Sequence, residues 1–111
     1  MTPPLENSSR PAATARDGHD LPGFRERRFI LANRLGLHAR AAVQLVKTTN
    51  QFRSEIWVAA HGLHVNGKSV MGLLTLAAAQ RASLLVTCEG EDAAAAMEAV
   101  AAIIEAGFGE K

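Results

Sequence analysis

The sequence predicts a two-layer α/β sandwich, in which helices pack on one face of a small sheet. Two kinds of hydrophobic pattern alternate along the chain, one with the period of a strand and one with the spacing of a helix. They follow the order strand, helix, strand, strand, helix, strand, helix, which is typical of helices layered against a sheet. The chain has 111 residues, which is room for one domain.

The first 25 residues differ from the rest of the chain. They contain all four prolines and no periodic hydrophobic pattern. Such a composition cannot bury enough apolar surface to offset the entropy lost on folding. We therefore expect a disordered tail at residues 1–25 and one folded domain at residues 26–111.

The folded part opens with a strand and a helix. Residues 28–32 carry three consecutive large hydrophobic side chains before the turn-like segment Asn33–Gly36, which predicts a short strand. Alanines and valines then recur at helical spacing from Ala39. This spacing predicts a helix over residues 39–50.

A hairpin is predicted next. Residues 55–60 alternate in the period of two that marks a strand with two unlike faces, and Trp57 alternates away from its hydrophobic neighbours. His61 and Gly62 form the expected two-residue turn, where glycine takes a positive φ at little cost. Residues 63–66 are the returning strand.

A helix, a strand and a final helix complete the domain. Ser69 is suited to cap a short helix that ends near Leu76, because its hydroxyl oxygen can accept a hydrogen bond from a free N–H group. The hydrophobic run at residues 84–88 predicts the fourth strand. The third helix is expected over residues 93–106, and Gly107 is suited to end it.

Composition excludes several classes of function. The 12 basic and 11 acidic side chains leave a formal net charge of +1, without the basic footprint of a nucleic-acid binder. No apolar run is long enough for a secretory signal or a membrane span, so we expect no membrane insertion. The single cysteine, Cys88, cannot form an internal disulfide and is expected as a buried strand residue, which fits the cytoplasm. The histidine spacing fits no zinc pattern, and we expect neither metal nor cofactor.

A candidate chemical site lies where the first helix begins. His38 and Arg40 stand two residues apart at the helix N-terminus, which leaves N–H groups unpaired and carries a partial positive charge that favours an anion. The neutral imidazole is a nucleophile, which makes His38 the candidate acceptor of a phosphoryl group. The Arg40 guanidinium can grip phosphoryl oxygens. These features predict a phosphate site.

Three stretches of the chain resemble the histidine-containing phosphocarrier protein (HPr) family in their order and spacing. They are Asn33–Arg40, Gly67–Leu74 and Glu89–Ala93, and the resemblance extends over residues 27–106. It implies an open-faced sandwich with a four-stranded antiparallel sheet in the spatial order 1-4-2-3 and three helices on one face. It also implies a phosphocarrier of the phosphoenolpyruvate-dependent phosphotransferase system, working as a cytoplasmic monomer and not as an enzyme.

The resemblance also implies roles for individual residues. Enzyme I would donate a phosphoryl group to Nδ1 of His38, and the phosphorylated carrier would pass it to an enzyme IIA domain or a regulatory target. Arg40 would stabilise the phosphate. The surface that docks these partners would include Gln44, Lys47, Val70 and Met71.

Ser69 is a candidate site of regulation. A phosphate there would lie at a helix N-terminus, yet it would place a charge of about −1.5 to −2 beside Val70 and Met71. The resemblance implies such a role, because in many bacteria the matching serine of the family is phosphorylated by HPr serine kinase/phosphorylase, which slows phosphorylation of the histidine. Ser69 can equally be a plain helix cap. One alternative function is a regulatory interaction domain that is switched only at Ser69.

A nucleotide-binding P-loop is a second alternative. The chain matches the P-loop pattern from Gly62 onward: a glycine, four residues, and then Gly67-Lys68-Ser69. However, residues 63–66 alternate like a strand, whereas a P-loop needs residues that are free to wrap a phosphate. No aspartate ends the later strand, where a magnesium ligand is expected.

Two positions depart from the family pattern. Ala41 stands where proline is usual, in the first turn of the helix, and alanine is compatible with a helix there. Arg81 stands where glycine is frequent after the second helix. We therefore expect that turn to be strained or differently shaped.

Overall fold

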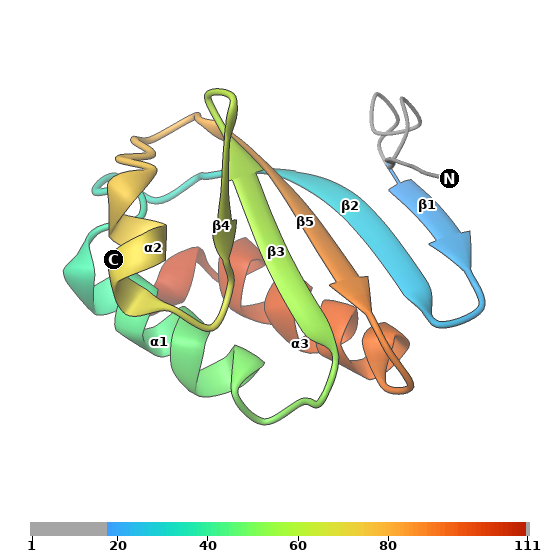
Figure 1. Cartoon of the computed structure of the whole chain (residues 1–111). Coiled ribbons are helices and arrows are strands. Elements are labelled where there is room, and N and C mark those ends of the chain that lie inside the picture. The colour runs from blue at the N-terminus through green and yellow to red at the C-terminus, as the bar shows by residue number, and fades with distance from the viewer. Residues whose placement is uncertain (1–17, 111) are drawn as a thin grey trace.

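A computed structural model describes residues 18–110 of the chain, and Figure 1 shows its elements. The disorder predicted for residues 1–17 lies outside this range. The strands are β1 (Gly18–Leu21), β2 (Phe24–Ile30), β3 (Glu55–Ala60), β4 (Leu63–Asn66) and β5 (Ser83–Glu89). The helices are α1 (Ala39–Thr49), α2 (Val70–Thr75) and α3 (Ala93–Glu105), and a short 3-10 helix follows at Gly107–Gly109.

The five strands form one antiparallel sheet in the spatial order β1-β2-β5-β3-β4. The last four of these strands correspond to the predicted ones, and they lie in the predicted order. The predicted number of strands is wrong, because β1 adds a fifth strand beside β2. Its backbone pairs with β2 from Gly18, opposite Arg27, to Leu21, opposite Phe24.

The β1–β2 hairpin also corrects the expected boundary of the tail and the start of the first predicted strand. Residues 18–25 form β1, its turn and the beginning of β2. Gly23 has a φ of +69° in that turn, a conformation that glycine adopts without strain. No hydrophobic alternation marks β1, because it lies at the sheet edge and is held by backbone pairing with β2.

The helices position the core on one face of the sheet. Helix α3 crosses β2 and β5 and lies beside α1, while α2 packs against α1 and β4 (Figure 1). On the other face, Trp57 is 39% exposed, which confirms that it points away from the core. Side chains at the centre of the core are completely or almost completely buried: Leu31, Leu45, Ile56, Leu73, Leu84 and Met97.

Two local predictions are confirmed. The N–H of Gly72 donates to Oγ of Ser69 over 2.9 Å, so Ser69 caps α2. His61 and Gly62 form the turn between β3 and β4, with φ values of +53° and +79°. Positive φ at both central residues is the geometry of the tight hairpin turn that suits the twist of paired strands.

Arg81 adopts the left-handed conformation expected of the glycine that is frequent at its position. Its φ is +75°, and its N–H donates to the backbone oxygen of Leu31 over 2.7 Å, which holds the turn in place. A residue with a Cβ atom is strained in this region. The expected strain in this turn is therefore present.

Cys88 lies in β5 with its side chain fully buried. Burial, together with the nearby charge of Asp92, raises the pKa of its thiol to about 12. A thiol that stays protonated is a poor nucleophile, and Cys88 therefore serves as a small core residue. None of the helices within residues 18–110 has the length and hydropathy needed to cross a membrane.

Candidate functional site

His38 is the N-cap residue of α1, and the loop before it is fixed by backbone contacts. Gly36 has a φ of +64°, and the N–H of Leu37 donates to the oxygen of Ala78 over 2.8 Å. The side-chain amide of Asn33 donates to the oxygen of Gly36 over 2.7 Å. These bonds hold the loop to the segment after α2, and so they fix where His38 enters the helix.

The His38 side chain is available at the helix end. It is 26% exposed and makes no capping hydrogen bond to the helix. The first bond of the helix runs from the N–H of Ala42 to the oxygen of His38, over 2.8 Å, so the N–H groups before Ala42 have no partner within the helix. No acidic residue lies in the first turn to compete for them. This end of α1 can accept an anion.

Glu110 is a neighbour of His38 that the sequence pattern does not indicate. Its Oε2 lies 3.8 Å from Nε2 of His38, and its Oε1 accepts a hydrogen bond from the N–H of Leu35 over 3.3 Å. The carboxylate is only 17% exposed. Because the two residues lie far apart in the sequence, no local motif could have signalled this contact.

Arg40 lies one residue inside the helix and is exposed to solvent. Its guanidinium makes no ion pair or hydrogen bond with any other residue in the described range, 18–110. Its donors are therefore available to a ligand. Ala41, the position where the family usually has proline, is fully buried within the same turn.

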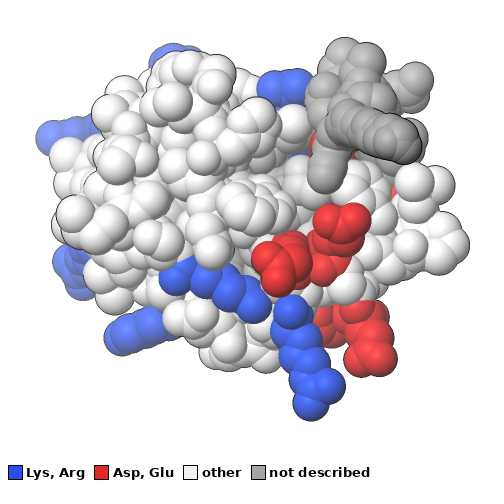
Figure 2. Space-filling model, viewed as in Figure 1, with Lys and Arg blue, Asp and Glu red and all other residues white. Residues whose placement is uncertain are grey.

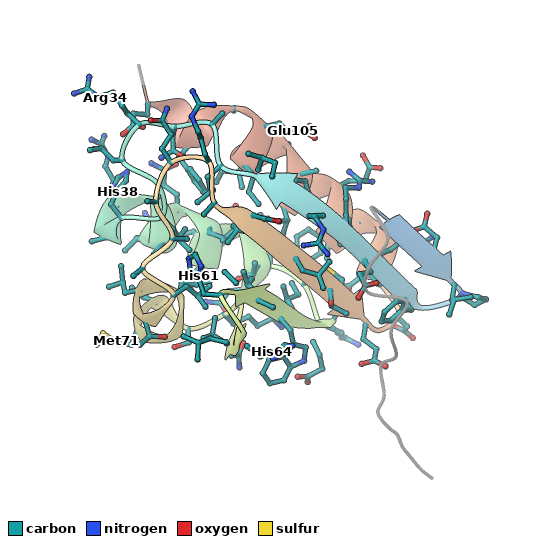
Figure 3. The ribbon with its side chains drawn as sticks, turned by 90° about the horizontal axis from the view of Figure 1, so that it is seen from above. Arg34, His38, His61, His64, Met71 and Glu105 are labelled. Atoms are coloured by element: carbon teal, nitrogen blue, oxygen red, sulfur yellow. The ribbon has the colours of Figure 1, made fainter. Side chains whose placement is uncertain are left out.

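The predicted docking residues lie on α1 and α2, two helices that pack against each other. Met71 is 72% exposed and Lys47 is also exposed, whereas Gln44 and Val70 are half-buried. Figure 3 shows His38 beside the start of α1, Met71 on α2 and His64 on the β4 hairpin. Two exposed hydrophobic side chains, Leu35 and Val43, also lie near His38 in the chain. The helical spacing that predicts α1 places Val43 on the face that packs on the core, and this is wrong, because Val43 is 40% exposed and the buried face of α1 is formed by Ala41, Ala42, Leu45 and Thr49.

The P-loop alternative does not fit the structure. Residues 63–66, the interior of the matching pattern, form strand β4 and pair with β3. The Lys68 ammonium donates to the backbone oxygen of Phe52 over 2.7 Å, so it points to the protein and not to an open loop. No backbone cradle for a phosphate is left in this segment.

Possible metal ligands form no centre in the described part of the chain. On the face that Figure 2 shows, acidic and basic side chains lie next to one another and most of the surface is uncharged. Among residues 18–110, no three histidine, cysteine or acidic side chains come together as metal ligands would. Among residues 18–110, His38 and Arg40 at the start of α1 remain the candidate chemical groups.

The comparisons with known proteins agree on one family. A family model described as the phosphorylation site of the PTS HPr component matches residues 25–106. The chain is 46% identical over 80 residues to the phosphocarrier protein HPr of Neisseria meningitidis, covering 72% of this chain and 90% of that protein. It is 42% identical over 85 residues to HPr of Xylella fastidiosa, covering 77% and 96%.

A solved structure shares the fold. The crystal structure of HPr from Thermoanaerobacter tengcongensis is similar with a TM-score of 0.75 at 38% sequence identity, over 78% of this chain and 97% of that one. The match of the family model extends from the second residue of β2 to the end of α3, so that β1 and the end of the chain lie outside it. The chain therefore belongs to the HPr family of phosphocarrier proteins of the phosphotransferase system.

Proposed function

We propose that His38 accepts a phosphoryl group from enzyme I, which takes it from phosphoenolpyruvate, and passes it to enzyme IIA domains or regulatory targets. The observation that carries this proposal is the accessible His38 imidazole at the N-terminus of α1. The chain is a carrier in this scheme and not an enzyme, because the group it receives leaves again on a partner. It works as a monomer in the cytoplasm, as its resemblance to the family implies.

The transfer needs a nucleophile and a place for negative charge. The lone pair on Nδ1 of His38 attacks phosphorus, the bond from phosphorus to the donor breaks, and the bonding electrons leave with the donor. The phosphoryl oxygens then lie near the free N–H groups of α1 and within reach of Arg40. The reverse sequence delivers the group to an acceptor. A shallow, exposed helix end suits such exchange between two protein partners.

The direct test is incubation of the purified chain with enzyme I, magnesium and phosphoenolpyruvate. We expect it to gain one acid-labile phosphate and to lose it when an enzyme IIA domain is added. Absence of any label would contradict the proposal. Tight binding of ATP in a calorimeter, without a kinase present, would instead support the P-loop alternative.

Arg40→Ala is expected to slow phosphoryl transfer on the order of 10²-fold, because a positioned donor to developing negative charge is removed. Arg40→Lys should recover only part of the rate, since an ammonium group keeps the charge but lacks the planar fork. Stopped-flow measurement of transfer from phosphorylated enzyme I gives both rates. If Arg40→Ala transferred the phosphoryl group at the wild-type rate, Arg40 would have no role in stabilising the phosphate.

We further propose that phosphorylation of Ser69 by HPr serine kinase/phosphorylase regulates the carrier. Ser69 begins α2, next to the exposed Met71, and α2 packs on the helix that carries His38 at its start. A phosphate there would put charge in the middle of the surface that partners approach. The cap itself would survive, because the helix N-terminus tolerates a negative group.

Ser69→Asp is expected to reduce the rate of phosphorylation of His38 by enzyme I on the order of tenfold, through the added charge. Asparagine caps a helix as well as aspartate does, so Ser69→Asn is the neutral control and should keep the wild-type rate. The same stopped-flow assay measures both variants. Equal rates in the two variants would mean that charge at this position does not control the transfer.

A further inference from the structure

We propose that Glu110 is a positioning residue for His38, which holds the imidazole with Nε2 toward its carboxylate and leaves Nδ1 free for the phosphoryl group. This inference rests on the proposed function of His38 and deepens it. It starts from the only ion-pair contact of His38 among residues 18–110, the 3.8 Å approach of Nε2 to Oε2 of Glu110.

The end of the chain is folded to place Glu110 at this site. After α3, Gly107 and Phe108 adopt positive φ values of +62° and +58°. The N–H of Glu110 then donates to the oxygen of Gly107 over 3.0 Å. A positive φ is costly for a bulky residue, and the burial of the Phe108 side chain offsets this cost. The turn is therefore held by packing against the core.

The carboxylate is bound to the same loop that carries His38. Its Oε1 accepts from the N–H of Leu35 over 3.3 Å, three residues before His38, which directs Oε2 toward the imidazole. A separation of 3.8 Å is longer than a hydrogen bond, and the contact acts through charge. Because the carboxylate is 17% exposed, solvent screens it less than it would screen a surface ion pair.

The negative charge has two chemical consequences. In the free carrier it favours the hydrogen on Nε2, so that the lone pair of the neutral ring is on Nδ1, the atom that attacks phosphorus. In the phosphorylated carrier it keeps Nε2 turned toward the carboxylate, so that the phosphoryl group on Nδ1 is presented to the acceptor in one orientation. When the phosphoryl group leaves for an acceptor, the electrons of the nitrogen–phosphorus bond return to Nδ1.

Glu110→Gln is the test variant, since it removes the charge and keeps an oxygen for the N–H of Leu35. Glu105→Gln is the matched control. It removes the same charge from the end of α3, at an exposed residue without a contact to His38 (Figure 3). The ¹⁵N NMR shifts of the imidazole report the tautomer in the free protein, and a rapid-quench assay measures transfer from phosphorylated carrier to enzyme IIA.

We expect wild type and Glu105→Gln to hold His38 mainly with hydrogen on Nε2, and Glu110→Gln to shift the population toward the other tautomer. Transfer to enzyme IIA should fall on the order of tenfold in Glu110→Gln. Glu110→Asp should restore part of the rate, because it keeps the charge.

An unchanged tautomer population together with an unchanged transfer rate in Glu110→Gln would overturn the role of Glu110. That result would leave the proposed function intact, because His38 would still carry the phosphate. Failure of the wild-type chain to accept a phosphate from enzyme I would contradict the proposed function instead. The NMR measurement needs no partner, so it separates the two outcomes.

Discussion

His38→Ala is expected to abolish enzyme I-dependent phosphorylation, since the nucleophile itself is removed. The fold should survive, because the His38 side chain makes no capping hydrogen bond and its backbone oxygen still begins α1. Unfolding by urea should therefore give a free energy within about 1 kcal/mol of wild type, because the loss is limited to a half-buried side chain and its contact with Glu110. Acid-labile incorporation of labelled phosphate measures the loss of function.

His64→Ala is the matched control for this loss. His64 is an exposed histidine on β4, and Figure 3 shows it away from His38. We expect it to be labelled like wild type. Label that remains in His38→Ala would assign the phosphate to another residue, and loss of label in both variants would point to a general effect on docking.

Gly36→Ala is expected to have the largest effect on stability. A Cβ atom at this position would lie 2.4 Å from the backbone oxygen of Ala78 and 2.8 Å from backbone atoms of Ala79. Backbone cannot swing aside as a side-chain tip can, and the φ of +64° adds strain for any residue with a Cβ atom. Overpacking and left-handed strain together predict a loss of about 2–5 kcal/mol in the free energy of unfolding.

Gly62→Ala separates these two causes. Gly62 has a φ of +79°, but a Cβ atom there would meet nothing within 4 Å. The Gly62→Ala variant should therefore lose only the contribution of the left-handed backbone, about 1–2 kcal/mol in the free energy of unfolding. Urea unfolding followed by circular dichroism measures both variants. Equal losses would show that the contact with residues 78 and 79 does not matter, and that the loop before His38 can shift without cost.

The helices and strands whose hydrophobic residues recur with a clear period were predictable from the sequence. Helix α1 begins at Ala39 and α3 ends at Glu105, close to the expected limits, because one face of each helix is buried and its spacing is visible. β1 was not predictable. It lies at the edge of the sheet, and backbone pairing, which leaves no mark in the sequence, is what holds it.

The start of β2 was missed for a related reason. Its first half is rich in charged residues, and Glu26 is 3% exposed in the folded chain although its type suggests a surface position. A prediction based on hydrophobic side chains therefore places the start of this strand too late in the sequence. The pairing of β2 with both β1 and β5 decides its true length.

The candidate site was predictable only where it is local. His38 and Arg40 lie within one turn of a helix start, and a glycine and a helical period mark that start. Glu110 depends on the positive φ of Phe108, an unusual conformation for a bulky residue that the sequence does not indicate. The approach of Glu110 to His38 is a product of the tertiary fold.

The central claim is that Nδ1 of His38 carries the phosphoryl group. NMR of uniformly ¹⁵N-labelled chain, phosphorylated by enzyme I and phosphoenolpyruvate, locates the group through the coupling between phosphorus and the ring nitrogen. We expect one phosphate per chain, bonded to Nδ1 of His38. Phosphate on Nε2, on another residue, or on Ser69 alone would contradict the account.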